Sequence, residues 1–207
     1  MPDRFNWETI KSEQLIDCRV FSVNRTLAAP GGSQDRAHNF YVLHPNNWVN
    51  VIAIDQNDQV VLIEQFRHGI GTLTLEIPGG MVDAEDPSAK HAAARELLEE
   101  TGYAARDLVH IGRNHPNPAI QSNYCDTFLA LNVERLFEPK FHSNEYIETR
   151  LTPIADLPLL IGSGRITHSL VIVAFYYLGL YEKTGKEYDP DAHKLVSAGV
   201  AATAALG

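Results

Sequence analysis

The 207-residue sequence has few cysteines and no long apolar run, and each shortage excludes a class of protein. Its two cysteines, Cys18 and Cys125, are too few for a zinc cluster or a disulfide framework, which indicates a reduced, cytoplasmic protein, although one bridge between them stays open. The longest apolar run, about residues 170–181, is shorter than the roughly 20 residues that cross a bilayer. The first residues lack the charged-then-apolar layout of a signal peptide. We therefore expect no membrane association.

Positive charge is also scarce, since 17 lysines and arginines face 26 acidic residues and leave a formal net charge of -9. Broad binding to nucleic acid draws its affinity from Lys and Arg side chains that neutralise phosphates, so nucleic acid is excluded as a general partner. An anionic small molecule remains compatible with this chain if acidic side chains hold divalent cations, because bound cations dominate the charge of a site.

The order of apolar patterns predicts one domain with strands before and after a single clear helix, and two more helices near the end. A polar turn at 55–58 predicts a hairpin between two of the strands. Strands are expected at 15–24, 40–43, 49–54, 59–66, 108–112, 124–131 and 146–151, and helices at 87–98, after 154 and at 167–181. This order predicts an α/β protein in which mixed sheets are sandwiched by helices.

The helix at 87–98 has local start and stop signals. Asp86 or Ser88 is a candidate N-cap, and Gly102 stands where a helix often ends. Just before it, Gly79 and Gly80 follow a predicted strand, where glycines let the backbone approach a ligand and offer carbonyl oxygens to a metal.

Three carboxylates gather near the end of this helix. Glu96 and Glu100 are four residues apart and share one face, with Glu99 beside them. Such like charges repel unless water or cations screen them, and a hard cation such as Mg²⁺ or Mn²⁺ would turn the repulsion into coordination. The plain alternative is a solvated acidic face in which Arg95 pairs with Glu99, and only the neighbouring Gly loop favours a metal and phosphate site over it.

The segment 79–103 resembles the box of the Nudix hydrolase family. That box reads Gly, five residues, Glu, seven residues, then Arg-Glu-aliphatic-any-Glu-Glu-any-Gly-aliphatic, and residues 95–102 match its second half, with Tyr103 in place of the last aliphatic. The first half departs from the pattern. Nine residues rather than seven separate Glu85 from Arg95, and a count from Gly80 puts Asp86 at the Glu position with one residue too many. Whether Glu85 or Asp86 meets Arg95 therefore stays open.

The resemblance implies roles for the helix residues. In that family the helix glutamates bind divalent ions, which implies Glu96 and Glu100 as principal ligands of Mg²⁺ (or Mn²⁺). It also implies Glu99 as a further or bridging ligand with a catalytic role, and Arg95 as its partner in the catalytic helix. A carbonyl of Gly79 or Gly80 would complete the set. The implied reaction is attack of an activated water on phosphorus, without a covalent enzyme intermediate.

Other segments resemble the ADP-ribose pyrophosphatase branch of that family. Arg67 follows the strand 59–66 and resembles a substrate-contacting arginine, the alternative being a surface salt bridge. Pro118 lies where the branch carries a proline, although Asn117 and Ala119 depart from its usual Ser-Pro-Gly.

Three further candidates rest on position. Glu145 resembles the branch's loop glutamate, which acts on the metals or the attacking water; a lone loop glutamate is as often only solvated. Met81 and Asn123 are candidates for substrate contact by position alone. Trp7 or Trp48 could stack on an adenine, but a core or interface role is commoner for such a residue.

The resemblance implies a Nudix fold with an N-terminal β arm. Residues 1–45 form the arm and a dimerisation element in a homodimer, 46–185 the hydrolase domain and 186–207 a tail. The expected function is metal-dependent hydrolysis of the diphosphate in a nucleoside diphosphate linked to another moiety, with ADP-ribose or a nucleotide sugar as the small-molecule substrate. The alternatives are coenzyme A, a dinucleoside polyphosphate or an oxidised nucleotide as substrate, or a non-catalytic nucleotide-sensing domain.

Overall fold

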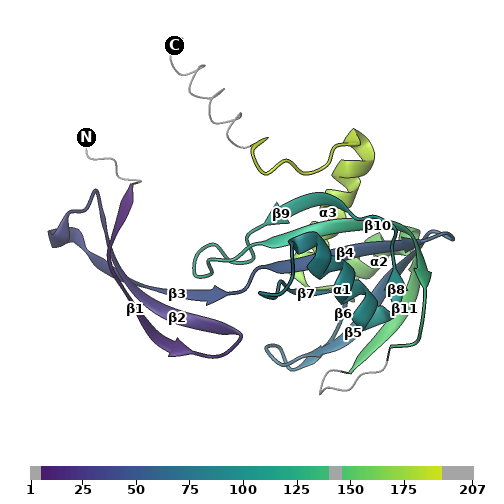
Figure 1. Ribbon diagram of the computed structural model, residues 1–207, viewed down its shortest axis with the longest axis horizontal. Helices are drawn as coiled ribbons and strands as arrows, with labels where there is room; N and C mark the ends of the chain where they lie inside the picture. The colour runs from purple at the N-terminus through teal and green to yellow at the C-terminus, as the bar shows by residue number, and fades with distance from the viewer. Residues whose placement is uncertain (1–5, 140–145, 193–207) are drawn as a thin grey trace, which may run out of the picture.

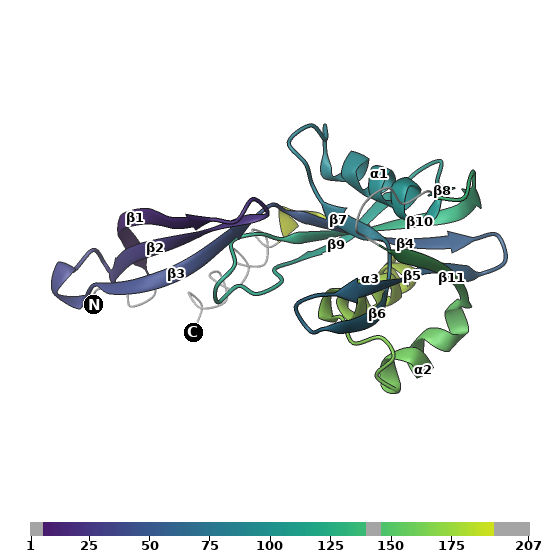
Figure 2. The same cartoon turned by 90° about the horizontal axis from the view of Figure 1, so that it is seen from below.

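A computed structural model describes residues 6–139 and 146–192 and shows a three-stranded arm joined to a helix-covered sheet (Figure 1). The arm contains β1 (Trp7–Asp17), β2 (Phe21–Pro30) and β3 (His38–Pro45), paired antiparallel in the order β1-β2-β3, with the short 3-10 helix η1 (Gln34–Arg36) between β2 and β3. The arm projects away from the rest of the molecule, and β3 leads directly into the main sheet (Figure 2).

The main sheet is mixed, as the strand and helix order predicted. Its central path runs β11-β5-β4-β10-β8, with β6 added to β5, β7 to β4 and β9 to β10. Strands β4 and β10 are parallel, and the other pairs are antiparallel. The bounds are β4 (Trp48–Asp55), β5 (Gln59–Arg67), β6 (Thr72–Glu76), β7 (Gly79–Met81), β8 (Tyr103–Ala104), β9 (Val109–Asn114), β10 (Cys125–Arg135) and β11 (Ile147–Pro153).

Helices cover both faces of this sheet, which explains why β4 and β5 are almost continuously apolar. Helix α1 (Ala89–Thr101) lies on one face, and α2 (Leu157–Gly162), preceded by the 3-10 helix η2 (Ile154–Asp156), lies with α3 (Ser169–Thr184) on the other (Figure 2). Alternate side chains of β4 enter two separate cores. Val51 packs in the core that contains Leu97 of α1, whereas Ile52 packs in the core that contains Val171 of α3.

The predicted fold class, including the N-terminal β arm, is confirmed, and one predicted strand is wrong. The structure splits the expected strand at 15–24 into the end of β1 and the start of β2, because the chain reverses at residues 18–20. Arg19 adopts a positive φ of 67°, and its N–H donates to the Asp17 carboxylate at 2.9 Å. Strands β6, β7 and β8 were not predicted, since each is too short for an alternation of apolar and polar residues to be visible.

The open alternatives at the cysteines and at the helix cap are resolved. Cys18 is exposed and Cys125 is buried, and both are free. Ser88 rather than Asp86 caps α1, because its hydroxyl accepts from the N–H of His91, and Gly102 ends the helix with a φ of 72°. Within the described ranges, no helix has the length and apolar character needed to cross a membrane.

Candidate active site

The glycine loop predicted from the sequence is the short strand β7, which lies directly on β4. Gly79 pairs with Asn50 and Gly80 pairs with Val49. A Cβ at Gly79 would lie 2.2 Å from the carbonyl oxygen of Val49, so the two strands approach as closely as they do only because residue 79 is glycine. This approach brings the loop backbone against α1.

The two helix glutamates that face the loop are held by it in different ways. Glu100 is buried, and its carboxylate accepts a hydrogen bond of 2.9 Å from the backbone N–H of Gly79. The Glu96 carboxylate packs over Gly80, where an added Cβ would lie 2.4 Å from its Oε1. Burial raises the pKa of Glu96, an effect that the neighbouring Arg95 opposes. Glu96 is therefore a desolvated carboxylate, and a second cation beside it would favour its charged form.

A matched pair of glycine variants separates the two contacts. In Gly80→Ala, the new methyl group meets the movable carboxylate of Glu96, so we expect near-normal thermal stability with at least about tenfold lower activity, because misplaced reacting groups cost more than their contacts suggest. In Gly79→Ala, it meets the backbone of β4, so we expect the free energy of unfolding to fall by about 1–3 kcal/mol. Thermal melts and initial rates measure both, and equal effects of the two variants on stability would contradict this assignment.

Arg95 joins the loop before α1 to the acidic face of the helix. Its Nε and Nη2 donate to the two oxygens of Asp86 at 3.2 and 2.9 Å, and its Nη2 also donates to the carbonyl oxygen of Met81 at 3.1 Å. Its Nη1 donates to Glu96 at 3.0 Å and to Glu99 at 3.1 Å. The hydrogen bonds that Arg95 donates to Asp86 raise the pKa of Arg95 and hold the pKa of Asp86 below its ordinary value.

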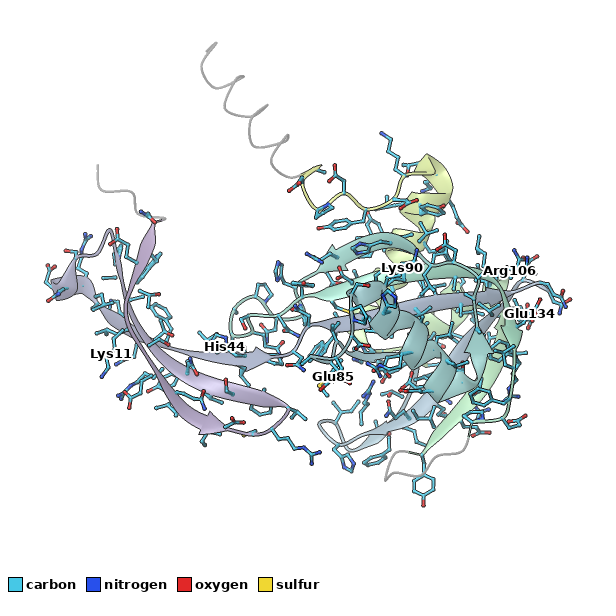
Figure 3. The ribbon with its side chains drawn as sticks, in the orientation of Figure 1. Lys11, His44, Glu85, Lys90, Arg106 and Glu134 are labelled. Atoms are coloured by element: carbon cyan, nitrogen blue, oxygen red, sulfur yellow. The ribbon has the colours of Figure 1, made fainter. Side chains whose placement is uncertain are left out.

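These contacts decide the alternative left open by the irregular spacing. Asp86 is the acid that meets Arg95, whereas Glu85 is exposed in the loop before α1 (Figure 3). The chain forms a turn at residues 83–86, in which the Asp86 carboxylate accepts a hydrogen bond of 2.9 Å from the N–H of Asp83. This turn accommodates the extra residue in the spacing. Glu99 keeps 61% of its side chain exposed, so its pairing with Arg95 is the surface contact that the plain reading of this helix expected.

A second ion pair lies on the neighbouring strands β5 and β6. Arg67 donates from Nε and Nη2 to the two oxygens of Glu76, both at 2.8 Å, and the Thr74 hydroxyl donates to the same carboxylate at 2.5 Å. Burial opposes ionisation of Glu76, yet these donors keep its pKa below the ordinary value. Glu76 is thus a charged and fully compensated buried carboxylate.

A cavity of about 300 Å³ lies between these two groups of residues. Its lining includes Trp48, Asn50, Arg67, Glu76, Gly79, Gly80, Met81 and His168. A larger hollow of about 690 Å³ between α2 and α3 is lined almost entirely by apolar side chains, with Glu182 as its one acidic residue. Of these two, the first combines apolar lining with convergent polar groups and includes the glycine loop that packs on the helix carboxylates, so it is the candidate site.

The structure brings together some of the predicted site residues and separates others. Arg67 and Met81 line the cavity with the two glycines. Pro118 is exposed in the turn after β9, and Asn123 is buried, with its side-chain amide donating to the carbonyl oxygen of Asn46 at 3.0 Å; neither lines this cavity. Glu145 lies outside the described residues.

Three cavity residues were missed by sequence reasoning, namely Glu76, Asn50 and His168. Glu76 carried a weak signal, since an acidic residue stands between the apolar residues Leu75 and Ile77, nine positions after Arg67. Asn50 and His168 carried none, because they are brought to the cavity by the register of β7 on β4 and by the start of α3.

Among residues 6–139 and 146–192, no three Asp, Glu, His or Cys side chains stand close enough together to hold a metal ion as they are placed. Arg95 lies against Glu96 and Glu99, so it occupies the position of a cation beside the acidic face. Glu100 contacts the Gly79 backbone instead.

Comparison with known proteins identifies relatives over most of the chain. The NUDIX domain model matches residues 44–171. The ADP-ribose pyrophosphatase of Bacillus subtilis is 28% identical over 84% of this chain and 94% of its own length, and the methanol dehydrogenase activator of Bacillus methanolicus is 30% identical over 86% and 95%. The crystal structure of an ADP compounds hydrolase superposes with a TM-score of 0.74 at 21% identity, covering 86% of this chain and 94% of that one, which supports the fold.

Proposed function

Because this chain belongs to the NUDIX domain family and is a Nudix hydrolase of the pyrophosphatase type, we propose that it hydrolyses the diphosphate of ADP-ribose or of a related nucleotide sugar in a divalent-metal-dependent reaction. The observation that carries this proposal is the packing of the Glu96 and Glu100 carboxylates against the Gly79–Gly80 backbone, which lines the cavity; these four residues are called the metal wall below. The similarity to an ADP-ribose pyrophosphatase over most of the chain supports the choice of substrate.

The wall fits a hard divalent cation by its donor chemistry. Glu96 is a desolvated carboxylate with a raised pKa, and a carboxylate in that state gains from a nearby cation. Glu100 and the loop carbonyls add oxygen donors, which Mg²⁺ and Mn²⁺ prefer. When bound, such an ion neutralises the diphosphate and lowers the pKa of a water that attacks phosphorus. Arg95 fixes the Glu96 carboxylate at the loop, and Glu99 and Glu145 remain proposed participants.

Arg67 is the proposed substrate contact on the other side of the cavity. Its guanidinium is oriented by two hydrogen bonds to Glu76 and keeps 40% of its side chain exposed. A guanidinium fixed in this way has a defined orientation at the cavity, which suits contact with an oxygen of the substrate.

The test is product analysis with the metal varied. We expect the purified protein to release AMP from ADP-ribose with Mg²⁺ or Mn²⁺, to lose that activity after chelation, and to regain it when the metal is restored. Chromatography of AMP and ribose 5-phosphate measures both products. Undiminished release of AMP in excess chelator would contradict the metal dependence, and hydrolysis of coenzyme A or a dinucleoside polyphosphate in preference to ADP-ribose would contradict the substrate.

We also propose that the arm forms a homodimer. Among the residues of the arm that the structure describes, seven large apolar side chains are exposed, and exposed apolar patches of a soluble protein often mark an interaction surface. They are Trp7, Ile10, Leu15, Ile16, Val20, Phe40 and Tyr41. Light scattering measures the mass directly, and a monomer of 23.0 kDa at micromolar concentration would contradict the proposal.

A further inference from the structure

The candidate cavity is lined by polar groups that do not belong to the metal wall of Glu96, Glu100 and the Gly79–Gly80 backbone. Asn50, on β4, and His168, at the start of α3, line it together with the Arg67–Glu76 pair. The two charges of that pair cancel through two hydrogen bonds. Burial lowers the pKa of His168 from 6.5, so its imidazole is neutral near pH 7. This part of the cavity therefore carries no net charge, in contrast to the carboxylates of α1.

Two buried atoms in this uncharged part have no hydrogen-bond partner anywhere in the described ranges. They are Nδ2 of Asn50 and Nδ1 of His168. A buried polar atom without a partner costs roughly 1–3 kcal/mol, and most such atoms in folded proteins are paired. Two such atoms in residues that line one cavity therefore indicate a ligand whose polar groups hydrogen-bond to both.

The chemistry of the two atoms distinguishes between ligand groups. The side-chain N of Asn50 only donates, whereas Nδ1 of a neutral imidazole accepts or donates according to its tautomer. A phosphate oxygen only accepts and carries charge, so it matches the neutral part of the cavity poorly. A hydroxyl group both donates and accepts, and it satisfies either tautomer of His168 as well as Asn50.

We propose that Asn50 and His168 are specificity-determining residues that hydrogen-bond to hydroxyl groups of the sugar linked to the diphosphate. The proposal rests on the proposed function, since it names the part of the same substrate that these residues bind. A cavity of about 300 Å³ lies at the lower end for small-molecule sites, so it accommodates a sugar with its phosphates rather than a whole dinucleotide. The metal wall then takes the diphosphate, and the uncharged part takes the sugar.

The experiment measures each side-chain variant on a substrate with the sugar and on a substrate without it. The enzymes are the wild type, His168→Leu, His168→Asn and Asn50→Ala. The substrates are ADP-ribose and the methyl ester of ADP, which keeps the diphosphate but has no second sugar. For ADP-ribose, His168→Leu and Asn50→Ala should each lower kcat/KM roughly two- to tenfold, the range expected for one neutral hydrogen bond, mainly through KM. For the methyl ester, neither substitution should change kcat/KM.

His168→Asn serves as the rescue variant, because an amide places a polar atom close to the position of Nδ1. It should recover most of the activity on ADP-ribose that His168→Leu loses. If His168→Leu does not fold, Asn50→Ala alone should still lower the ratio of kcat/KM for ADP-ribose to kcat/KM for the methyl ester.

Three outcomes would overturn the proposal. Equal losses on both substrates would mean that the two side chains only support the fold, and no loss on either would mean that they touch no substrate. If the effect of the substitutions on kcat/KM changes when hypoxanthine replaces adenine in the substrate, and does not change when the sugar is removed, the two side chains contact the base instead. If the wild-type protein releases AMP from neither ADP-ribose nor the methyl ester of ADP, the proposed function itself is contradicted. That outcome is distinct from the three above.

Discussion

Glu100→Gln is expected to reduce the hydrolysis of ADP-ribose at least about 100-fold while leaving the protein folded. The substitution removes one negative charge from the proposed metal wall and almost no volume. A glutamine oxygen can still accept the 2.9 Å hydrogen bond from the N–H of Gly79, so the contact between β7 and α1 survives. Loss of an outer partner of a metal site already costs 10–100-fold, and a direct ligand should cost at least as much. Initial rates at saturating Mg²⁺ measure the effect.

Glu85→Gln is the matched control for this prediction. It makes the same chemical change in the loop before α1, but Glu85 is exposed and Arg95 pairs with Asp86 instead. Its rate should stay within about twofold of the wild type, because exposed substitutions away from such contacts have small effects. A large loss in Glu85→Gln with normal rates in Glu100→Gln would reverse the assignment of the two acids.

Arg95→Lys is expected to lower both stability and activity, although it keeps the positive charge. The guanidinium reaches Asp86, Met81 and the helix glutamates at once through a planar fork, and an ammonium group cannot reproduce that geometry. Asp86 then loses its two-point partner, which should lower the free energy of unfolding by about 1–3 kcal/mol. A rate at least about tenfold lower is expected because Glu96 is no longer fixed at the loop.

Lys90→Ala on the same helix is the comparison for Arg95→Lys. Its ammonium pairs with Asp107 at 2.5 Å, but both side chains are at least half exposed, at 50% and 73%. Such a pair contributes at most about 1 kcal/mol, so the melting temperature should move little and the rate should not change. Thermal melts of the two variants, together with their rates, make the comparison. Equal shifts in both would mean that Arg95 is an ordinary surface residue.

The features that the sequence predicted well are those that depend on neighbouring residues. Helix α1 was expected at 87–98 and is found at Ala89–Thr101, because its cap Ser88 and its end at Gly102 are local signals. The expected strand at 15–24 was wrong because the reversal at Arg19 has no glycine or proline to indicate it.

Long-range register explains what the sequence could not provide at the site. The irregular spacing left Glu85 and Asp86 equivalent, and only the fold of the loop shows which of them Arg95 contacts. Asn50 and His168 are more than 100 residues apart, and no spacing rule connects them. The shared helix face of Glu96 and Glu100, by contrast, follows from helical periodicity and was predicted from the residues alone.

The central claim is that Glu96 and Glu100 hold a divalent cation at the cavity, and a Mn²⁺ titration followed by electron paramagnetic resonance tests it most directly. The account predicts that the wild-type protein binds Mn²⁺, that Mg²⁺ displaces it, and that Glu96→Gln and Glu100→Gln each weaken binding at least about tenfold. Glu85→Gln should bind as the wild type does. Unchanged Mn²⁺ affinity in both helix variants would contradict the claim.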